Sequence, residues 1–212
     1  MITITGTKAL LENGYKKVDL VINDGKFIDI KENNNCDDND LIIIPGFFDI
    51  HTHGANGRDF TTVKSISEIE EILKFYESHG VTSVFPTLLT EHDDLIFKQL
   101  ELIYRASLKH KIIKGIHLEG PFLSKKYKGA QLEECIQIPS IDKCKLFIEH
   151  SHNLFKYMTI APETPNSFET IKFLCEKGIN VSMGHSDASF DDAKNAREAG
   201  AKCFTHLFNA MK

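Results

Sequence analysis

The side chains best able to do chemistry in this sequence are histidines and a glutamate at the ends of predicted strands. Five of them can ligate a metal: His51, His53, Glu119, His185 and His206. On a strand, residues i and i+2 point to the same face, so His51 and His53 can reach one ion, and His117 and Glu119 share a face in the same way. A barrel gathers the ends of several strands into one site, which would bring these side chains together.

The ligand types predict a divalent metal site. Imidazole and carboxylate without thiolate suit Zn, Fe, Mn or Co, and the sequence does not choose among them. Glu119, His185 and His206 meet the usual requirement of a catalytic zinc, which is three protein ligands and an open position for water. His51 and His53 can hold a second ion, so we expect one or two ions. A lone histidine is more often simply hydrogen-bonded, but four strand ends in register are hard to explain by chance.

Strands that alternate with helices must position these side chains. After Pro45 the apolar pattern predicts six strands, at residues 47–53, 81–89, 112–118, 156–161, 179–183 and 201–208. The helices between them begin at caps such as Ser67 and Ser189 and end at the glycines at 80, 178 and 200. This alternation implies a parallel sheet, either doubly wound or closed as a barrel. Polar strand ends, with no glycine-rich turn after the first strand, favour the barrel.

The pattern divides the chain into two parts. Residues 1–45 contain short strands around an Asn23-Asp24-Gly25 turn, then a polar loop at 33–40 and an apolar run that begins at Leu41. We expect this part to be a small β element that precedes the main domain. Residues 46–212 are expected to form the first six βα units of the barrel.

Composition narrows the class of protein. The 212 residues are 42% hydrophobic, and 30 acidic against 25 basic residues give a formal charge of -5, which argues against a nucleic-acid partner. Five cysteines without a CxxC pair argue against a disulfide framework or a structural zinc site. The first residues lack a signal-peptide core, and no apolar segment is long enough to span a membrane. We therefore expect a cytoplasmic protein.

Several motifs resemble one family. HLEGPF at 117–122, KGA at 128–130, MGHSDAS at 183–189 and THLFNAM at 205–211 resemble the N-acetylglucosamine-6-phosphate deacetylases. PGFFDIHTHG at 45–54 resembles the opening of the wider amidohydrolase superfamily. The resemblance implies an α/β fold, an incomplete (β/α)8 TIM-type barrel with six of eight units, preceded by part of a small β-sandwich that the family builds from both chain ends.

The resemblance also implies an activity and its partners. The family hydrolyses the acetamide of N-acetylglucosamine 6-phosphate to glucosamine 6-phosphate and acetate, and the resemblance implies a homodimer for full-length members. Glu119, His185 and His206 match the principal metal ligands, and His51 with His53 matches a pair that holds a second metal in some members. Four residues match two pairs that contact the substrate: Ala130, Gln131, Asn209 and Ala210.

The sequence departs from the family pattern at two places. Gln131 stands where the family usually has histidine, so that contact can donate a hydrogen bond but cannot carry a proton charge. The family's catalytic aspartate lies near the end of the eighth strand, which we expect beyond Lys212. Asp187 belongs to the motif that follows the fifth strand. We expect it at most to contact a metal ligand, and not to contact the metal or to take the place of the aspartate. We therefore expect no catalytic acid–base residue within residues 1–212.

Two alternatives stay open from the sequence. Another HxH metallohydrolase, such as a metallophosphatase or a cyclic-amide hydrolase, would keep the metal and change the reaction, although HLEGPF argues against both. A fragment that binds metal or sugar phosphate without turnover is the alternative of a different class. Six barrel units would leave two unpaired sheet edges, which favours association or poor folding of this chain alone.

Overall fold

The computed structural model describes residues 1–33 and 42–212. The chain divides into two compact units, Met1–Gly46 and Phe47–Lys212. Most of the predicted polar loop at 33–40, and Leu41 at the start of the apolar run, lie outside the described residues.

The first unit is a four-stranded sheet with the order β3-β2-β1-β4. Its strands are β1 (Ile2–Leu11), β2 (Gly14–Asn23), β3 (Lys26–Glu32) and β4 (Ile42–Ile43). The predicted hairpin is present between β2 and β3, and Asp24 and Gly25 both have positive φ (50° and 71°), as a two-residue type I′ turn requires. A small core contains Ala9, Val18 and Leu20. The β-sandwich stays a prediction, because the described residues of this unit form a single sheet.

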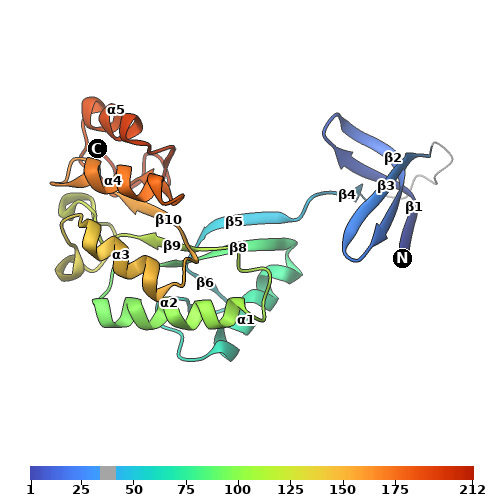
Figure 1. Ribbon diagram of the computed structural model, residues 1–212, viewed down its shortest axis with the longest axis horizontal. Coiled ribbons are helices and arrows are strands. Elements are labelled where there is room, and N and C mark those ends of the chain that lie inside the picture. The colour runs from blue at the N-terminus through green and yellow to red at the C-terminus, as the bar shows by residue number, and fades with distance from the viewer. Residues whose placement is uncertain (34–41) are drawn as a thin grey trace. The chain divides into compact units, whose positions relative to one another are not determined.

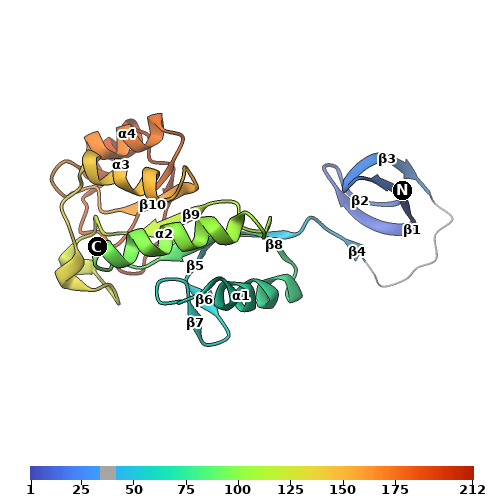
Figure 2. The ribbon, with the colours of Figure 1, turned by 60° about the horizontal axis from the view of Figure 1, so that its bottom comes forward.

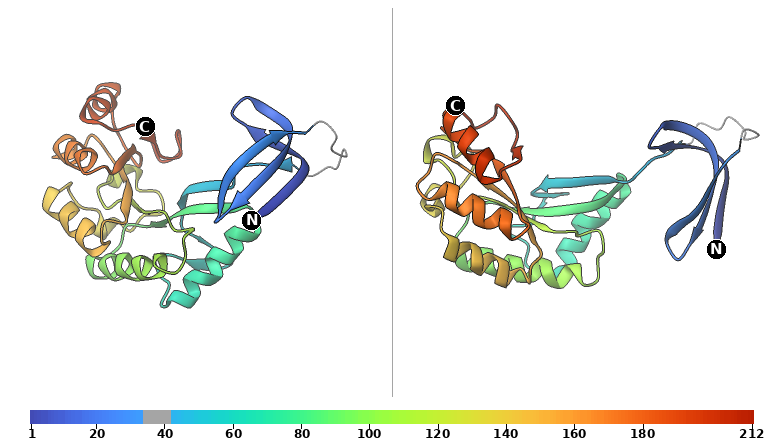
Figure 3. Two further views of the ribbon diagram at one scale, coloured as in Figure 1. Left: turned by 45° about the vertical axis from the view of Figure 1, so that its right-hand side comes forward. Right: turned by 45° about the horizontal axis from the view of Figure 1, so that its top comes forward.

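The second unit is built on six parallel strands that follow one another in space in the order of the sequence. They are β5 (Phe47–Thr52), β8 (Val81–Leu88), β9 (Ile116–Glu119), β10 (Phe155–Ile160), β11 (Asn180–Met183) and β12 (Cys203–Phe204). A doubly wound sheet reverses its strand order at a switch point, and this sheet does not. The sheet curls as part of a barrel, with helices along its outer side (Figure 3). The α/β class and the barrel type are confirmed.

Five helices connect the strands, and Figures 1 and 2 show them along the sheet. They are α1 (Ile66–Ser78), α2 (Asp93–Ser107), α3 (Ile141–His150), α4 (Ser167–Glu176) and α5 (Phe190–Ala199). The glycines that follow three of them have positive φ, 82° at Gly80, 74° at Gly178 and 120° at Gly200, so the predicted glycine ends are confirmed. Smaller elements are the pair β6 (Gly54–Ala55) and β7 (Arg58–Asp59), and two short 3-10 helices at Lys125–Tyr127 and Glu133–Cys135.

Two local predictions were wrong. Helix α1 is capped by Ser65 and not by Ser67, because the extended backbone of Ser65 lets its hydroxyl accept from Glu68 N, while Ser67 already lies in the first turn. The sixth strand is only two residues long. His206 and Phe208 have positive φ (33° and 77°), which turns the chain away from the sheet before 208.

A continuous apolar core lies between the sheet and the helices. The apolar faces of α1, α2 and α4 are buried in it, and its largest fully buried side chains include Phe60, Phe122, Phe147, Phe155 and Leu100. Packing in this core holds the strands in place. The strands in turn position the side chains at their carboxyl ends. Among the described residues, no helix combines the length and apolar character needed to cross a bilayer.

Candidate metal centre

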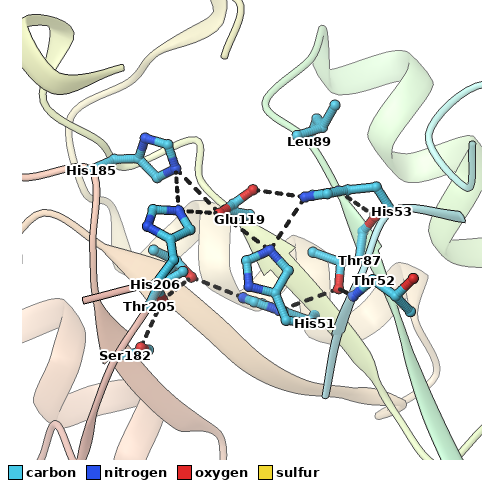
Figure 4. Close-up of polar contacts among 12 residues, drawn as sticks. His51, Thr52, His53, Thr87, Leu89, Glu119, Ser182, His185, Thr205 and His206 are labelled. Carbon is cyan, nitrogen blue, oxygen red and sulfur yellow. Dashed lines mark hydrogen bonds and ion pairs between the residues drawn. The ribbon is translucent and has the colours of Figure 1, made fainter. Parts of the chain in front are cut away.

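Glu119 is the centre of a cluster at the carboxyl ends of the strands (Figure 4). It is the last residue of β9 and is only 2% exposed. Its Oε1 lies 3.2 Å from both His185 Nε2 and His206 Nε2. Its Oε2 lies 3.0 Å from His53 Nε2, while His51 Nε2 is 3.3 Å from Oε1. The four histidines predicted as ligands therefore meet around the carboxylate of the fifth, Glu119.

Backbone carbonyls orient three of the imidazoles. The Nδ1 atoms of His53, His185 and His206 lie 3.2, 3.0 and 3.0 Å from the carbonyl oxygens of Thr87, Tyr127 and Asn209, respectively. A carbonyl oxygen only accepts, so each Nδ1 carries the hydrogen of its neutral ring. Each Nε2 is then left with a free lone pair that points at Glu119. This carbonyl–imidazole arrangement is the usual support of a metal-binding histidine.

The Nε2 atoms also face one another in two pairs. His51 Nε2 lies 3.2 Å from His53 Nε2, and His206 Nε2 lies 3.1 Å from His185 Nε2. In the His185–His206 pair both Nε2 atoms carry lone pairs, which repel at this distance unless a cation lies between them. A tetrahedral zinc with bonds of 2.0–2.1 Å holds two nitrogens about 3.3 Å apart. The donor set therefore fits divalent ions in two groups that share Glu119, one with His51 and His53 and one with His185 and His206.

The cluster keeps its central carboxylate ionised. Burial raises the pKa of Glu119, but without an ion the Nε2 atoms of His185, His51 and His53 can carry protons, and their hydrogen bonds then outweigh burial and hold that pKa well below its usual range. Burial likewise lowers the pKa of His53, but the neighbouring Glu119 outweighs it and raises that pKa above the ordinary value. Both shifts report the same attraction of the site for positive charge.

Unusual backbone conformations carry two of the histidines. His185 and His206 have φ of 49° and 33°, in the left-handed region that non-glycine residues avoid. Such conformations cost about 1–3 kcal/mol each and persist where surrounding structure imposes them. Here Ser186 N donates to Ala210 O at 3.1 Å, which ties the turn after β11 to the turn after β12. These backbone conformations direct the Nε2 atoms of His185 and His206 at Glu119.

His117 lies beneath the cluster and is not among its ligands. It is fully buried, and its Nδ1 donates to the carbonyl oxygen of Ile50 at 3.1 Å, while its Nε2 lies 2.9 Å from Thr159 Oγ1. Burial is the main reason that the pKa of His117 falls to about 3. The neutral ring packs edge-on against His51 at 4.7 Å between centroids and supports it.

Buried hydroxyl groups continue this support across the next strands, and sequence reasoning missed them. Thr159 Oγ1 lies 2.8 Å from Thr205 Oγ1, which lies 2.7 Å from Ser182 Oγ. All three side chains are buried. A signal for them was present, since polar residues in otherwise apolar strands of a barrel point to its interior.

The four predicted substrate-contact residues lie around the rim of the cluster. Ala130 and Asn209 are exposed, and Ala210 is half-buried with φ of 49°. Gln131 is only 3% exposed, and its side chain contacts Glu119. A Cβ at Gly129 would lie 3.3 Å from the His185 ring and 3.8 Å from Ala210 Cβ, so the two rim segments are adjacent.

A third group of potential ligands lies nearby, formed by Glu91, His92 and Cys135. Burial and the carboxylates of Glu91 and Glu134 raise the pKa of the Cys135 thiol. Metals bind the thiolate, so a thiol kept protonated at neutral pH is a poor ligand. His92 is also exposed. Among the described residues, the cluster around Glu119 is therefore the better metal site.

The fold and this cluster together define a class of protein. A curled parallel sheet that gathers imidazoles and one carboxylate at its strand ends is the arrangement of a metal-dependent barrel hydrolase. Residues 42–212 match the sequence model of the amidohydrolase family, so the chain belongs to that family. Within it, the chain is similar to N-acetylglucosamine-6-phosphate deacetylases: the Bacillus subtilis protein of that name is 34% identical over 99% of this chain and 55% of its own length.

Other relatives carry the same name. The human N-acetylglucosamine-6-phosphate deacetylase is 36% identical over 80% of this chain and 43% of its own length. The crystal structure of the Mycobacterium smegmatis deacetylase matches with a TM-score of 0.89 and 26% identity, over 99% of this chain and 57% of that one. A mutant of that enzyme in complex with N-acetyl-D-glucosamine-6-phosphate matches with a TM-score of 0.90 and 27% identity, over 100% and 56%. The chain spans about half the length of the relatives it matches.

Proposed function

We propose that this chain provides the metal centre of an N-acetylglucosamine-6-phosphate deacetylase, which hydrolyses the acetamide to glucosamine 6-phosphate and acetate. The observation that carries the proposal is the position of Glu119 between two histidine pairs whose Nε2 atoms face one another. The names of the relatives supply the substrate. Homodimerisation and a cytoplasmic location remain predictions.

The ligands divide between two ions in this proposal. Glu119, His185 and His206 would hold the first ion, and His51 and His53 with the shared Glu119 would hold the second. A bound divalent ion supplies Lewis acidity, which polarises a carbonyl and lowers the pKa of a water. The carbonyl groups of Thr87, Tyr127 and Asn209 keep the hydrogens on the far side of three rings, so the histidines accept an ion without reorganising.

Three of the rim residues, Ala130, Asn209 and Ala210, are assigned to the sugar phosphate, whereas the carboxamide of Gln131 is already bonded to Glu119 and Thr90. Ala130 and Gln131 lie on one side of the cluster, and Asn209 and Ala210 lie on the other. Positive φ at His206, Phe208 and Ala210, on alternate residues, supports an anion-binding role for this turn, because such alternation can point successive backbone N–H groups into one concavity. Of the nearby lysines, Lys126 pairs with Asp187 at 2.8 Å and remains largely exposed.

No proton-transfer residue is assigned within this chain. The most tempting candidate, Asp187, has its Oδ2 in the ion pair with Lys126, and its backbone N–H donates to Glu163. General acid–base catalysis contributes about 10²–10⁴-fold to a rate. We therefore propose that this chain binds the sugar phosphate and turns it over very slowly.

The metal-loaded chain is expected to release acetate from N-acetylglucosamine 6-phosphate about 10²–10⁴-fold more slowly than the full-length Bacillus subtilis relative. The assay uses Zn or Mn, and N-acetylglucosamine without phosphate is the control substrate. Release of phosphate, or ring opening of a cyclic amide, would favour another metallohydrolase. Substrate binding with no metal-dependent acetate above background would favour the fragment that binds without turnover.

A further inference from the structure

The buried side chain of Gln131 contacts the carboxylate that the two histidine pairs share. Its Nε2 donates to Glu119 Oε2 at 2.9 Å, and its Oε1 accepts from Thr90 N at 2.7 Å. A backbone N–H can only donate, so the amide oxygen must face Thr90 and the amide nitrogen must face Glu119. The orientation of the carboxamide is therefore fixed by its partners.

Thr90 completes this hydrogen-bond network on the backbone side of Glu119. Its hydroxyl donates to the backbone carbonyl oxygen of Glu119 at 3.2 Å, so Thr90 holds the main chain of Glu119 while Gln131 holds its carboxylate. All three residues are nearly inaccessible, with exposures of 2%, 3% and 2% for Thr90, Gln131 and Glu119. A buried network that is fully satisfied is rigid.

The bond from Gln131 determines which oxygen faces which histidines. It occupies one side of Oε2, the oxygen next to His53, and so prevents the carboxylate from rotating about its last bond. Oε1 is left for His185, His206 and His51. Without this bond, the two oxygens could exchange places or both turn toward one histidine pair.

We propose that Gln131 is a positioning residue that holds Glu119 as a bridge between the two histidine pairs and thereby sets the affinity of this chain for divalent ions. This inference rests on the metal centre of the proposed function and not on its substrate. Metal binding is measured without substrate, so failure of the deacetylase assay and failure of this inference are distinguishable.

The test is zinc affinity, measured by competition with a chromophoric chelator. Outer-shell partners of metal ligands are typically worth 10–100-fold in affinity, so Gln131→Met, which keeps the length and removes both hydrogen bonds, is expected to bind zinc about 10–100-fold more weakly. Gln131→His restores one donor and one acceptor in a single side chain and is expected to bind close to wild type.

Gln137→Met is the matched control, because Gln137 lies in the same loop and donates to a carboxylate outside the cluster, Asp93 Oδ1 at 3.0 Å. It is expected to leave zinc affinity unchanged. If Gln131→Met does not fold, Gln131→Asn replaces it, since its shorter carboxamide cannot span Thr90 and Glu119. Wild-type affinity in folded Gln131→Met or Gln131→Asn, or an equal loss in Gln137→Met, would overturn the proposal.

Discussion

Glu119→Gln is expected to lower the affinity of the chain for zinc by more than about 100-fold, because outer-shell partners alone are worth 10–100-fold and Glu119 belongs to both ligand groups. The change keeps the shape of the side chain but removes its negative charge and replaces one ligand oxygen with an amide nitrogen, which cannot coordinate. The measurement is zinc retained after gel filtration, together with the dissociation constant from chelator competition.

Glu101→Gln is the control for this loss. Glu101 also pairs with a histidine, His152, at 2.7 Å, but this pair lies on the surface. It tests whether any glutamate–histidine pair in the chain contributes to the bound zinc. If Glu119→Gln retained zinc at wild-type affinity, or if Glu101→Gln lost as much, the ligand assignment would be wrong.

Gly120→Ala is expected to lower the free energy of unfolding of the metal-free chain by about 2–5 kcal/mol, which combines backbone strain with overpacking. Gly120 has φ of 99°, and a Cβ at this position would lie 2.1 Å from Thr90 Oγ1 and 3.0 Å from Leu123 Cδ1. Both neighbours are buried, so neither can move away freely. Urea denaturation in the presence of a chelator measures the change.

Gly178→Ala separates the two causes. Gly178 also has positive φ, 74°, but a Cβ there would meet nothing within 4 Å, so this variant reports the backbone strain alone. The difference between the two variants then measures the contact with Thr90 and Leu123. Equal destabilisation by both would show that the close approach at Gly120 costs nothing, contrary to the packing described above.

Much of the fold follows from local patterns. The glycines at 80, 178 and 200 mark helix ends because the positive φ there favours glycine. The convergence of His51, Glu119 and the other ligands also follows from the sequence, since parallel strands place their carboxyl ends at one edge. The spacing of two residues is enough to put His51 and His53 on one face.

Other features depend on contacts that no local pattern encodes. The carboxamide of Gln131 lies in a loop without regular periodicity, and its partners, Thr90 and Glu119, are 41 and 12 residues away. His117 shares a face with Glu119 but is held beneath the cluster by Thr159, a residue of the next strand. The short sixth strand depends on the turn that aims His206 at the cluster, where tertiary contacts override strand propensity.

X-ray absorption at the zinc edge of the zinc-loaded chain tests the metal centre most directly. The account predicts a first shell of nitrogen and oxygen alone, at about 2.0–2.2 Å, with the outer scattering of imidazole rings. Sulfur scattering at about 2.3 Å would instead place the ion on Cys135 with Glu91 and His92. That result, or a chain that retains no zinc, would contradict the central claim that Glu119 and the four histidines hold the metal.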